Sequence, residues 1–434
     1  MRLRRLCAPL ACLLIATLAG CGSAPPVRQA AAAAGRAASV NVPAPSVQLA
    51  GLTEPAGTIP GIFAEAGDNA PKEPTPSADL APQAAAAVLM DAASGQVLWA
   101  KNANARRPAA SVTKLMTMAL VLDAVSSGRI RWNDLVSASQ QAVQTGGAQI
   151  WLELGENMTV QQLFYAVAVQ SANDAAVALG EYVGGTMNHF VAMMNAKAQT
   201  LGMRDTLYTD ANGLDDTAQY TSAYDIALLS RYLVTAHPEV LKYTSTWEHR
   251  LRGNKLWLVN RNKLLTRLPG VDGLKTGFTT NAGYCLSATA RRGATRLIAV
   301  VLGDPTGAAR FHDAAAQLQW GFSHYSTVPV AQAGQAVTEL PVDGGHVRSV
   351  RIVPSESFGV TVPRGQEKGV TTKVQLPKLL SAPLGARQKV GEITAFVDGR
   401  SVAQVPLLTA GAVRRVGGLR LWMRLWAGLW PWLR

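Results

Sequence analysis

The chain has 434 residues, 48% of them hydrophobic and 16% charged, so it can bury the cores of two or more domains and does not have the composition of a disordered protein. Its formal net charge of +13 is typical of proteins that bind nucleic acid or anionic membranes. Arginines are concentrated in residues 2–5 and 412–434, and tryptophans accompany them in the second segment. This distribution favours a membrane surface and argues against nucleic acid.

Residues 1–21 have the pattern of an export signal. Basic residues precede an apolar run from Leu6 to Leu18, which is too short to span a bilayer. The segment ends in Leu-Ala-Gly-Cys, which resembles a bacterial lipobox with Cys21 as the lipid-modified residue. Ordinary cleavage after a small residue is the alternative. Either way, we expect an exported protein.

Residues 22–82 are rich in proline and alanine and poor in large apolar side chains. Such a segment cannot bury enough surface to offset the entropy cost of ordering, so we expect a flexible spacer. Beyond it, Cys285 is the only cysteine. The mature chain therefore has no partner for an internal disulfide if Cys21 carries lipid.

Residues 83–323 are predicted to form an α+β domain. Two apolar runs flank a turn at Ser94-Gly95, which is typical of a hairpin. From about residue 108 to 245 the pattern is mostly helical, and residues 159–162 read Thr-Val-Gln-Gln, a capping-box signature. Three strand-like segments and a helix over 308–322 follow. This order predicts an antiparallel sheet built from both ends of the domain, with a helical insertion between them.

The first candidate site residues are Ser111 and Lys114, which lie three residues apart where the first long helical pattern begins. At this spacing the lysine amine can reach the serine hydroxyl. A serine becomes a nucleophile when a base removes its proton, and a lysine can be that base if burial or a neighbouring cation lowers its pKa. A chain of this length contains about one Ser-x-x-Lys pair by chance. The hypothesis therefore depends on what lies downstream.

Two further patterns follow in order: Ser171-x-Asn173 at the end of a helical run, and Lys275-Thr276-Gly277 in a predicted strand. Taken singly, each has an ordinary interpretation as a helix start, a helix cap or a solvated strand residue. Taken together with Ser-x-x-Lys, they resemble the three signature motifs of the penicillin-recognising serine enzymes. The joint match is far more specific than any single motif.

Flanking sequences narrow the resemblance to the low-molecular-mass penicillin-binding proteins of the serine D-alanyl-D-alanine carboxypeptidase family, over roughly residues 84–410. The flanking sequences that carry this resemblance are residues 91–98, 260–265 and 272–279. The resemblance implies the α+β catalytic fold of β-lactamases and transpeptidases. It also implies a periplasmic location, peptidoglycan pentapeptides as substrate and β-lactams as inhibitors. No cofactor is expected, and the scattered histidines lack the spacing of a metal site.

The chemistry gives four of these residues roles in catalysis. Ser111 attacks the carbonyl between two D-alanines and forms an acyl-enzyme. Lys114 is the candidate base, and a second cation nearby, Lys275, would help lower its pKa. Ser171 can pass a proton toward the leaving amine, and Asn173 can hydrogen-bond Lys114 and the substrate amide.

The remaining candidates concern substrate binding. Lys275 and Thr276 suit the terminal carboxylate, and Gly277 allows the strand to approach the substrate backbone closely. By resemblance, the backbone N–H groups of the nucleophile and of Phe278 form the oxyanion hole, and Arg261 assists carboxylate binding. Phe278 departs from the family, which often has a polar side chain there, so only its backbone role is carried over.

Residues 326–411 alternate apolar and polar side chains between turn signals, such as Asp398-Gly399, and predict a small all-β domain. It resembles the C-terminal module of the carboxypeptidases, a stand that lifts the active site from the membrane. Residues 412–434 place tryptophans on one helical face and arginines on the other, which predicts an amphipathic helix in the membrane interface. A helix packed on the domain is the alternative.

Three other functions stay open: a D-alanyl endopeptidase, a β-lactamase on the same fold, and an inert penicillin-binding wall tether. A class A β-lactamase uses a glutamate in a Glu-x-x-Leu-Asn sequence to activate the deacylating water. Between the second and third motifs, Glu181, Glu239 and Glu248 all lack that context. The sequence therefore favours the carboxypeptidase.

Overall fold

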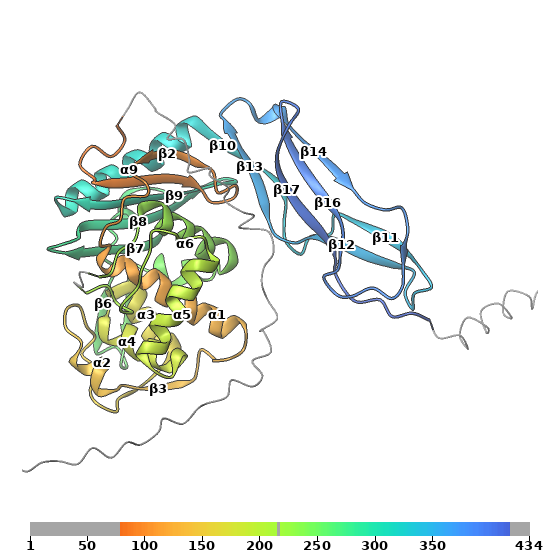
Figure 1. Cartoon of the computed structure of the whole chain (residues 1–434). Helices are drawn as coiled ribbons and strands as arrows, with labels where there is room; N and C mark the ends of the chain where they lie inside the picture. Colours follow the sequence, from red (N-terminus) through yellow and green to blue (C-terminus); the bar gives the residue numbers. More distant parts are fainter. Residues whose placement is uncertain (1–78, 215–217, 417–434) are drawn as a thin grey trace, which may run out of the picture. The chain divides into compact units, whose positions relative to one another are not determined.

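The computed structural model describes residues 79–214 and 218–416 (Figure 1). The predicted export signal, the predicted lipidation site Cys21 and nearly all of the predicted spacer lie outside the described residues. So do residues 417–434 of the tail. Those expectations remain predictions. The predicted tail helix does not begin at residue 412, because Val413 and Arg415 form β-bridges with Leu384 and Gly345, and Val413 is buried in the core of the second domain.

A five-stranded antiparallel sheet forms the centre of the first domain, and its order is β2-β1-β9-β8-β7. The hairpin at Ser94-Gly95 thus pairs with the last strand of the domain, which confirms a sheet built from both ends of the segment. The outermost strand on one side, β7, carries the Lys-Thr-Gly motif. The strands are β1 (Ala86–Asp91), β2 (Val97–Lys101), β7 (Val271–Thr279), β8 (Gly283–Arg292) and β9 (Thr295–Asp304).

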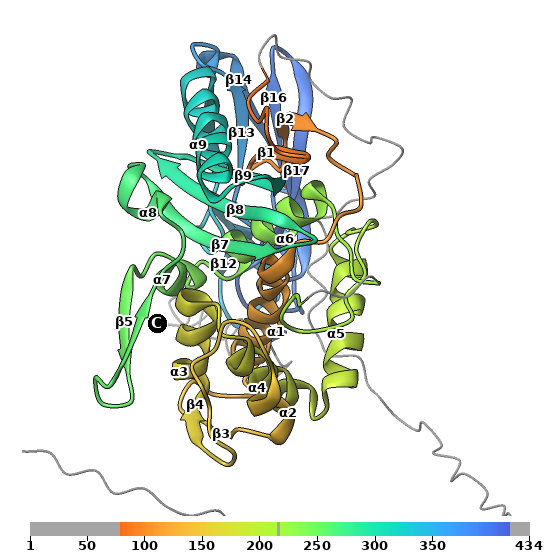
Figure 2. The ribbon, with the colours of Figure 1, turned by 90° about the vertical axis from the view of Figure 1, so that its left-hand side faces the viewer.

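Both faces of this sheet are covered. Because alternate residues of a strand point to opposite faces, Val88 and Met90 of β1 join the larger core, whereas Leu89 joins a smaller one. The larger core includes residues of α1 (Lys114–Ser126) and α6 (Ala223–Ala236), and the smaller one includes residues of α9 (Gly307–His324). Figure 2 shows α9 on one side of the sheet and α1 and α6 on the other.

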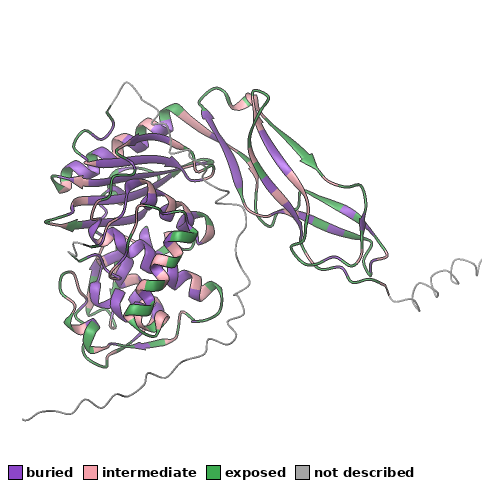
Figure 3. Ribbon diagram, in the orientation of Figure 1, coloured by how far each residue is buried: buried purple, intermediate pink, exposed green. Residues whose placement is uncertain are grey.

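The segment between β2 and β7 is mostly helical, as predicted, and its interior helices are buried in Figure 3. Thr159 and Gln162 form the predicted capping box at the start of α3. The further elements are η1 (Ala110–Thr113), β3 (Leu135–Ser137), α2 (Gln140–Gln144), β4 (Asn157–Thr159), α3 (Val160–Tyr165), η2 (Ala166–Gln170), α4 (Asn173–Gly184), α5 (Met187–Thr200), α7 (Val240–Thr244), β5 (Glu248–Leu251), β6 (Leu256–Val259) and α8 (Leu264–Arg267).

The second domain is all-β apart from one short 3-10 turn, η3 (Glu367–Gly369), and has a hydrophobic core of its own. Six strands follow the order β14-β16-β17-β12-β11-β15, and β10 pairs with β13. The predicted turn at Asp398-Gly399 joins β16 to β17. Its strands are β10 (Tyr325–Ala331), β11 (Thr338–Asp343), β12 (Ser349–Pro354), β13 (Phe358–Pro363), β14 (Val370–Gln375), β15 (Leu380–Ser381), β16 (Lys389–Val397) and β17 (Arg400–Thr409).

Candidate active site

Ser111 lies in η1, the tight 3-10 turn that immediately precedes α1. Lys114 is the first residue of α1 and is fully buried. Its Nζ lies 2.9 Å from Ser111 Oγ and donates a second hydrogen bond, 2.6 Å long, to the backbone oxygen of Asn212. The two side chains that the sequence paired are therefore in hydrogen-bond contact, and the lysine is held from two sides.

Burial lowers the pKa of Lys114 from 10.5 to about 7, and the negative charges of Asp210 and Asp174 oppose this change. A substantial fraction of the amine is thus neutral near pH 7 and can accept a proton. The sequence predicts that the neighbouring cation Lys275 helps to lower this pKa. In the structure burial is what lowers it, because packing removes the amine from contact with water.

The loop that holds Lys114 was not identified as part of the site from sequence. Asp210 Oδ1 accepts hydrogen bonds from the backbone N–H groups of Asn212 (2.8 Å) and Gly213 (2.5 Å), which turns the Asn212 carbonyl toward the lysine. Gly213 has a φ of +78°, and a Cβ there would lie 1.9 Å from the Ala110 oxygen. Only glycine allows this close approach of the loop to η1.

Ser171 reaches the site through an irregular helix end. The five residues of η2 form a π turn, and Ser171 follows in a left-handed conformation with φ 65° and ψ 31°. This geometry directs its hydroxyl to Lys275, whose Nζ lies 2.9 Å from Ser171 Oγ. The same Nζ donates to the backbone oxygen of Thr276 at 2.9 Å. The second and third motifs thus meet through one hydrogen bond across 104 positions of sequence.

Asn173 is also buried here, but its amide has a different partner from the one we expected. Its Nδ2 donates to the backbone oxygen of Gly146 at 2.7 Å, and its Oδ1 is buried without a hydrogen-bond partner among the described residues. The described residues include no hydrogen bond between Asn173 and Lys114, because the loop at Gly146 takes the donor side of the amide. The amide thus keeps one acceptor without a partner among the described residues.

Gly277 explains how β7 comes so close to the nucleophile. A Cβ at this position would lie 2.6 Å from the backbone oxygen of Ala109 and 3.1 Å from the backbone nitrogen of Ser111. The glycine therefore permits the approach of β7 to η1, in addition to the approach to substrate that the sequence suggested. The next side chain, Phe278, is 52% exposed and packs against Tyr284 with ring centroids 4.2 Å apart.

Lys275 on β7 lies near several other basic side chains. Burial lowers the pKa of Lys275 well below its usual range, and the charges of Lys114, Arg310 and Arg261 lower it further. Arg261 is thus close enough to influence Lys275, and its predicted part in carboxylate binding stays a prediction. An anionic ligand group would supply the countercharge and favour the charged form of Lys275.

The chain matches two family models that account for both domains. Residues 72–306 match the family described as D-alanyl-D-alanine carboxypeptidase, peptidase S11, and residues 325–415 match the C-terminal domain of penicillin-binding protein 5. The chain belongs to the peptidase S11 family of D-alanyl-D-alanine carboxypeptidases. Its relatives include D-alanyl-D-alanine carboxypeptidase DacF of Bacillus subtilis, 37% identical over 345 residues, which are 79% of this chain and 88% of the relative. DacC of Escherichia coli is 37% identical over 359 residues, 79% of this chain and 89% of the relative.

Solved structures of penicillin-binding proteins are similar to this chain in fold and sequence. Penicillin-binding protein 5 from Haemophilus influenzae is 35% identical, with a TM-score of 0.63, and the match covers 79% of this chain and 99% of that one. Penicillin-binding protein D2 from Listeria monocytogenes, solved in an ampicillin-bound form, is 35% identical with a TM-score of 0.52 over 57% of this chain and all of that one. The resemblance inferred from the motifs is confirmed.

One further residue of this carboxypeptidase site lies on α9. Arg310 is buried, and its Nη1 donates to the backbone oxygens of Gly277 at 2.8 Å and Cys285 at 3.3 Å. It therefore supports the strand that carries the Lys-Thr-Gly motif and adds positive charge beside Lys275. The sequence offered no signal for it, because Arg310 belongs to no motif and lies within an ordinary helical pattern.

Proposed function

We propose that this protein removes the terminal D-alanine from peptidoglycan pentapeptides through an acyl-enzyme on Ser111. Family membership supplies the reaction class. The observation that supports these roles most directly is the contact between Ser111 Oγ and a buried amine, Lys114, whose pKa is about 7. Covalent reaction with penicillin follows from the same nucleophile, since a β-lactam presents a strained acyl group to it.

In the first step Lys114 Nζ accepts the hydroxyl proton as Ser111 Oγ attacks the substrate carbonyl. The backbone N–H groups of Ser111 and Phe278 receive the negative charge that develops on the carbonyl oxygen. The bond to the leaving nitrogen then breaks, and Ser171 passes a proton to the departing amine of D-alanine. The acyl group remains as an ester on Ser111 until water hydrolyses it.

Substrate placement in this proposal depends on β7. Lys275 and Thr276 bind the terminal carboxylate, with Arg261 contributing charge nearby, and Asn173 Oδ1 accepts from a substrate amide. The basic side chains near Lys275, which are Lys114, Arg310 and Arg261, support this assignment. Their positive charge attracts an anion, and the terminal carboxylate of the substrate is one.

Purified full-length protein is expected to release D-alanine with steady turnover but to clear bound penicillin only slowly. A penicilloyl group blocks the approach of water, and the chain lacks the Glu-x-x-Leu-Asn base of class A β-lactamases. Parallel steady-state kinetics on a pentapeptide and on penicillin measure both rates. Penicillin hydrolysis faster than D-alanine release would indicate a β-lactamase, and no release from any peptide would indicate an inert tether. Release that occurs only from cross-linked peptides would indicate an endopeptidase.

We further propose that residues 83–323 form the catalytic domain and that residues 326–411 act as a stand between it and the membrane. The anchors in this proposal are lipid on Cys21 and an interfacial helix in residues 419–434, because stable residence commonly requires two weak signals. Within residues 79–214 and 218–416, no helix is both long and apolar enough to cross a bilayer.

Removing either anchor is expected to leave partial membrane binding, and removing both is expected to release the protein. The variants are Cys21→Ala, a truncation after residue 418, which keeps Val413 in the core of the second domain, and their combination. Sedimentation of membranes in high salt measures the bound fraction of each. Full sedimentation of the doubly altered protein would show that a different contact holds it.

A further inference from the structure

If the proposed function holds, the geometry of β7 sets the direction in which the peptide substrate crosses the site. β7 is the last strand of the sheet, so its outer edge has no strand partner among the described residues. The terminal carboxylate belongs beside Lys275, and the nucleophile lies beside Gly277. The residues that precede the scissile bond therefore continue past Phe278 toward the end of the strand.

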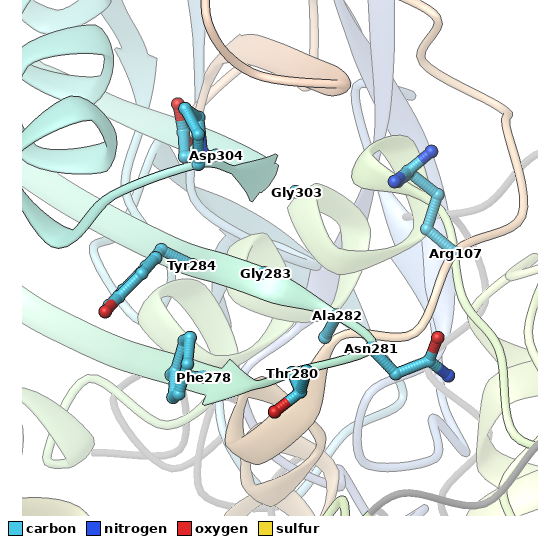
Figure 4. A pocket seen from close by; sticks show the side chains of 10 residues that line it. Arg107, Phe278, Thr280, Asn281, Ala282, Gly283, Tyr284, Gly303 and Asp304 are labelled. Atoms are coloured by element: carbon cyan, nitrogen blue, oxygen red, sulfur yellow. The ribbon is translucent and has the colours of Figure 1, made fainter.

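A pocket of about 500 Å³ lies at that end of β7 (Figure 4). The rings of Phe278 and Tyr284, which pack against each other at a tilt, form one wall, and the exposed side chains of Thr280 and Asn281 lie at the strand end. Arg107 lines it from the segment that precedes η1. None of these side chains has a part in the proposed chemistry. Phe278 contributes to it only through its backbone N–H.

The pocket has an unused positive charge. Among the described residues, no carboxylate forms an ion pair with Arg107, and its Nε is buried without a hydrogen-bond partner. Its guanidinium packs closely over Gly303, where a Cβ would lie 3.0 Å from Nη2. The adjacent Arg106, in contrast, forms an ion pair with Asp205 at 3.0 Å.

The one acid that lines the pocket, Asp304, is buried below its surface, and neither of its carboxyl oxygens has a hydrogen-bond partner among the described residues. Burial, followed by Asp313, raises the pKa of Asp304 to about 7. The carboxyl is also fully buried, so it is not available to a ligand in the pocket.

We propose that this pocket is a subsite for the side chain of the residue that directly precedes the acylated D-alanine, and that Arg107 selects side chains ending in a free carboxylate. In stem peptides this residue is a diamino acid. Diaminopimelate carries such a carboxylate at the end of its side chain, and lysine does not. The guanidinium offers a paired set of N–H donors that matches a carboxylate. The aromatic wall accommodates the methylene chain.

The test compares two pentapeptides that differ only at this residue, one with meso-diaminopimelate and one with L-lysine. The readout is the ratio of their kcat/KM values for D-alanine release. Wild-type protein is expected to prefer the diaminopimelate peptide about tenfold, as one charge-assisted hydrogen bond provides. Arg107→Gln is expected to bring this ratio close to one, and Arg107→Lys to retain part of it.

Arg106→Gln is the matched control, because it removes the same charge from the neighbouring residue outside the pocket and should leave the ratio at its wild-type value. Asn281→Asp is a second probe at an exposed position, and its added negative charge should lower the ratio. A wild-type ratio near one, or a ratio unaffected by both Arg107→Gln and Asn281→Asp, would overturn the subsite. Absence of D-alanine release from both peptides would instead contradict the proposed function.

Discussion

Ser111→Ala is expected to lower D-alanine release by about 10⁴-fold or more and to abolish covalent labelling by penicillin. The substitution removes only Oγ, the atom that lies 2.9 Å from Lys114 Nζ. Without it no acyl-enzyme can form, although β7 can still bind the peptide. Because Ser111 is half-buried in a turn and loses one atom, the fold should be retained.

Mass spectrometry after incubation with penicillin measures the adduct, and amino-acid analysis measures D-alanine. Ser127→Ala is a suitable control, because it alters an exposed serine just beyond the other end of α1. An adduct that persisted in Ser111→Ala at the wild-type rate would assign the nucleophile to another residue.

Acylation by penicillin is expected to rise tenfold per pH unit below pH 7 and to level off above it. The direction follows from the base: below its pKa of about 7 the Lys114 amine is protonated and cannot accept the serine proton, and above it the amine is neutral. Lys114→Gln removes the base and is expected to slow acylation by about 10²- to 10⁴-fold, with loss of this pH dependence.

Second-order acylation rates between pH 5 and 9 provide the measurement, with circular dichroism to verify folding at each pH. Lys255→Gln, at an exposed position, controls for loss of a lysine charge. A wild-type rate that did not change across pH 7, or a Lys114→Gln protein that was acylated as fast as wild type, would exclude Lys114 as the base.

The loop at Asn212 and the helix α9 show why part of this site could not be predicted. Lys114 and Asn212 are 98 positions apart, and Arg310 is 33 positions from Gly277. Neither contact leaves a local pattern, because the partner atoms are backbone oxygens, which every residue type carries. The amide of Asn173 is a similar case: its residue type suggested the hydrogen bonds it can make, but the position of Gly146 decided which one it makes.

What the sequence by itself determined was everything that depends on short spacing. The contact between Ser111 and Lys114 follows from their spacing of three residues in a helical segment. The capping box at Thr159 depends on residues within one helical turn. The strands of the sheet follow from the alternation of apolar and polar residues. The order of the three motifs was enough to identify the family. Only the tertiary structure decided the protonation state of Lys114, since burial lowers its pKa and burial is a property of packed neighbours. The same holds for the pocket beside Phe278, whose walls come from segments that meet only when the sheet forms.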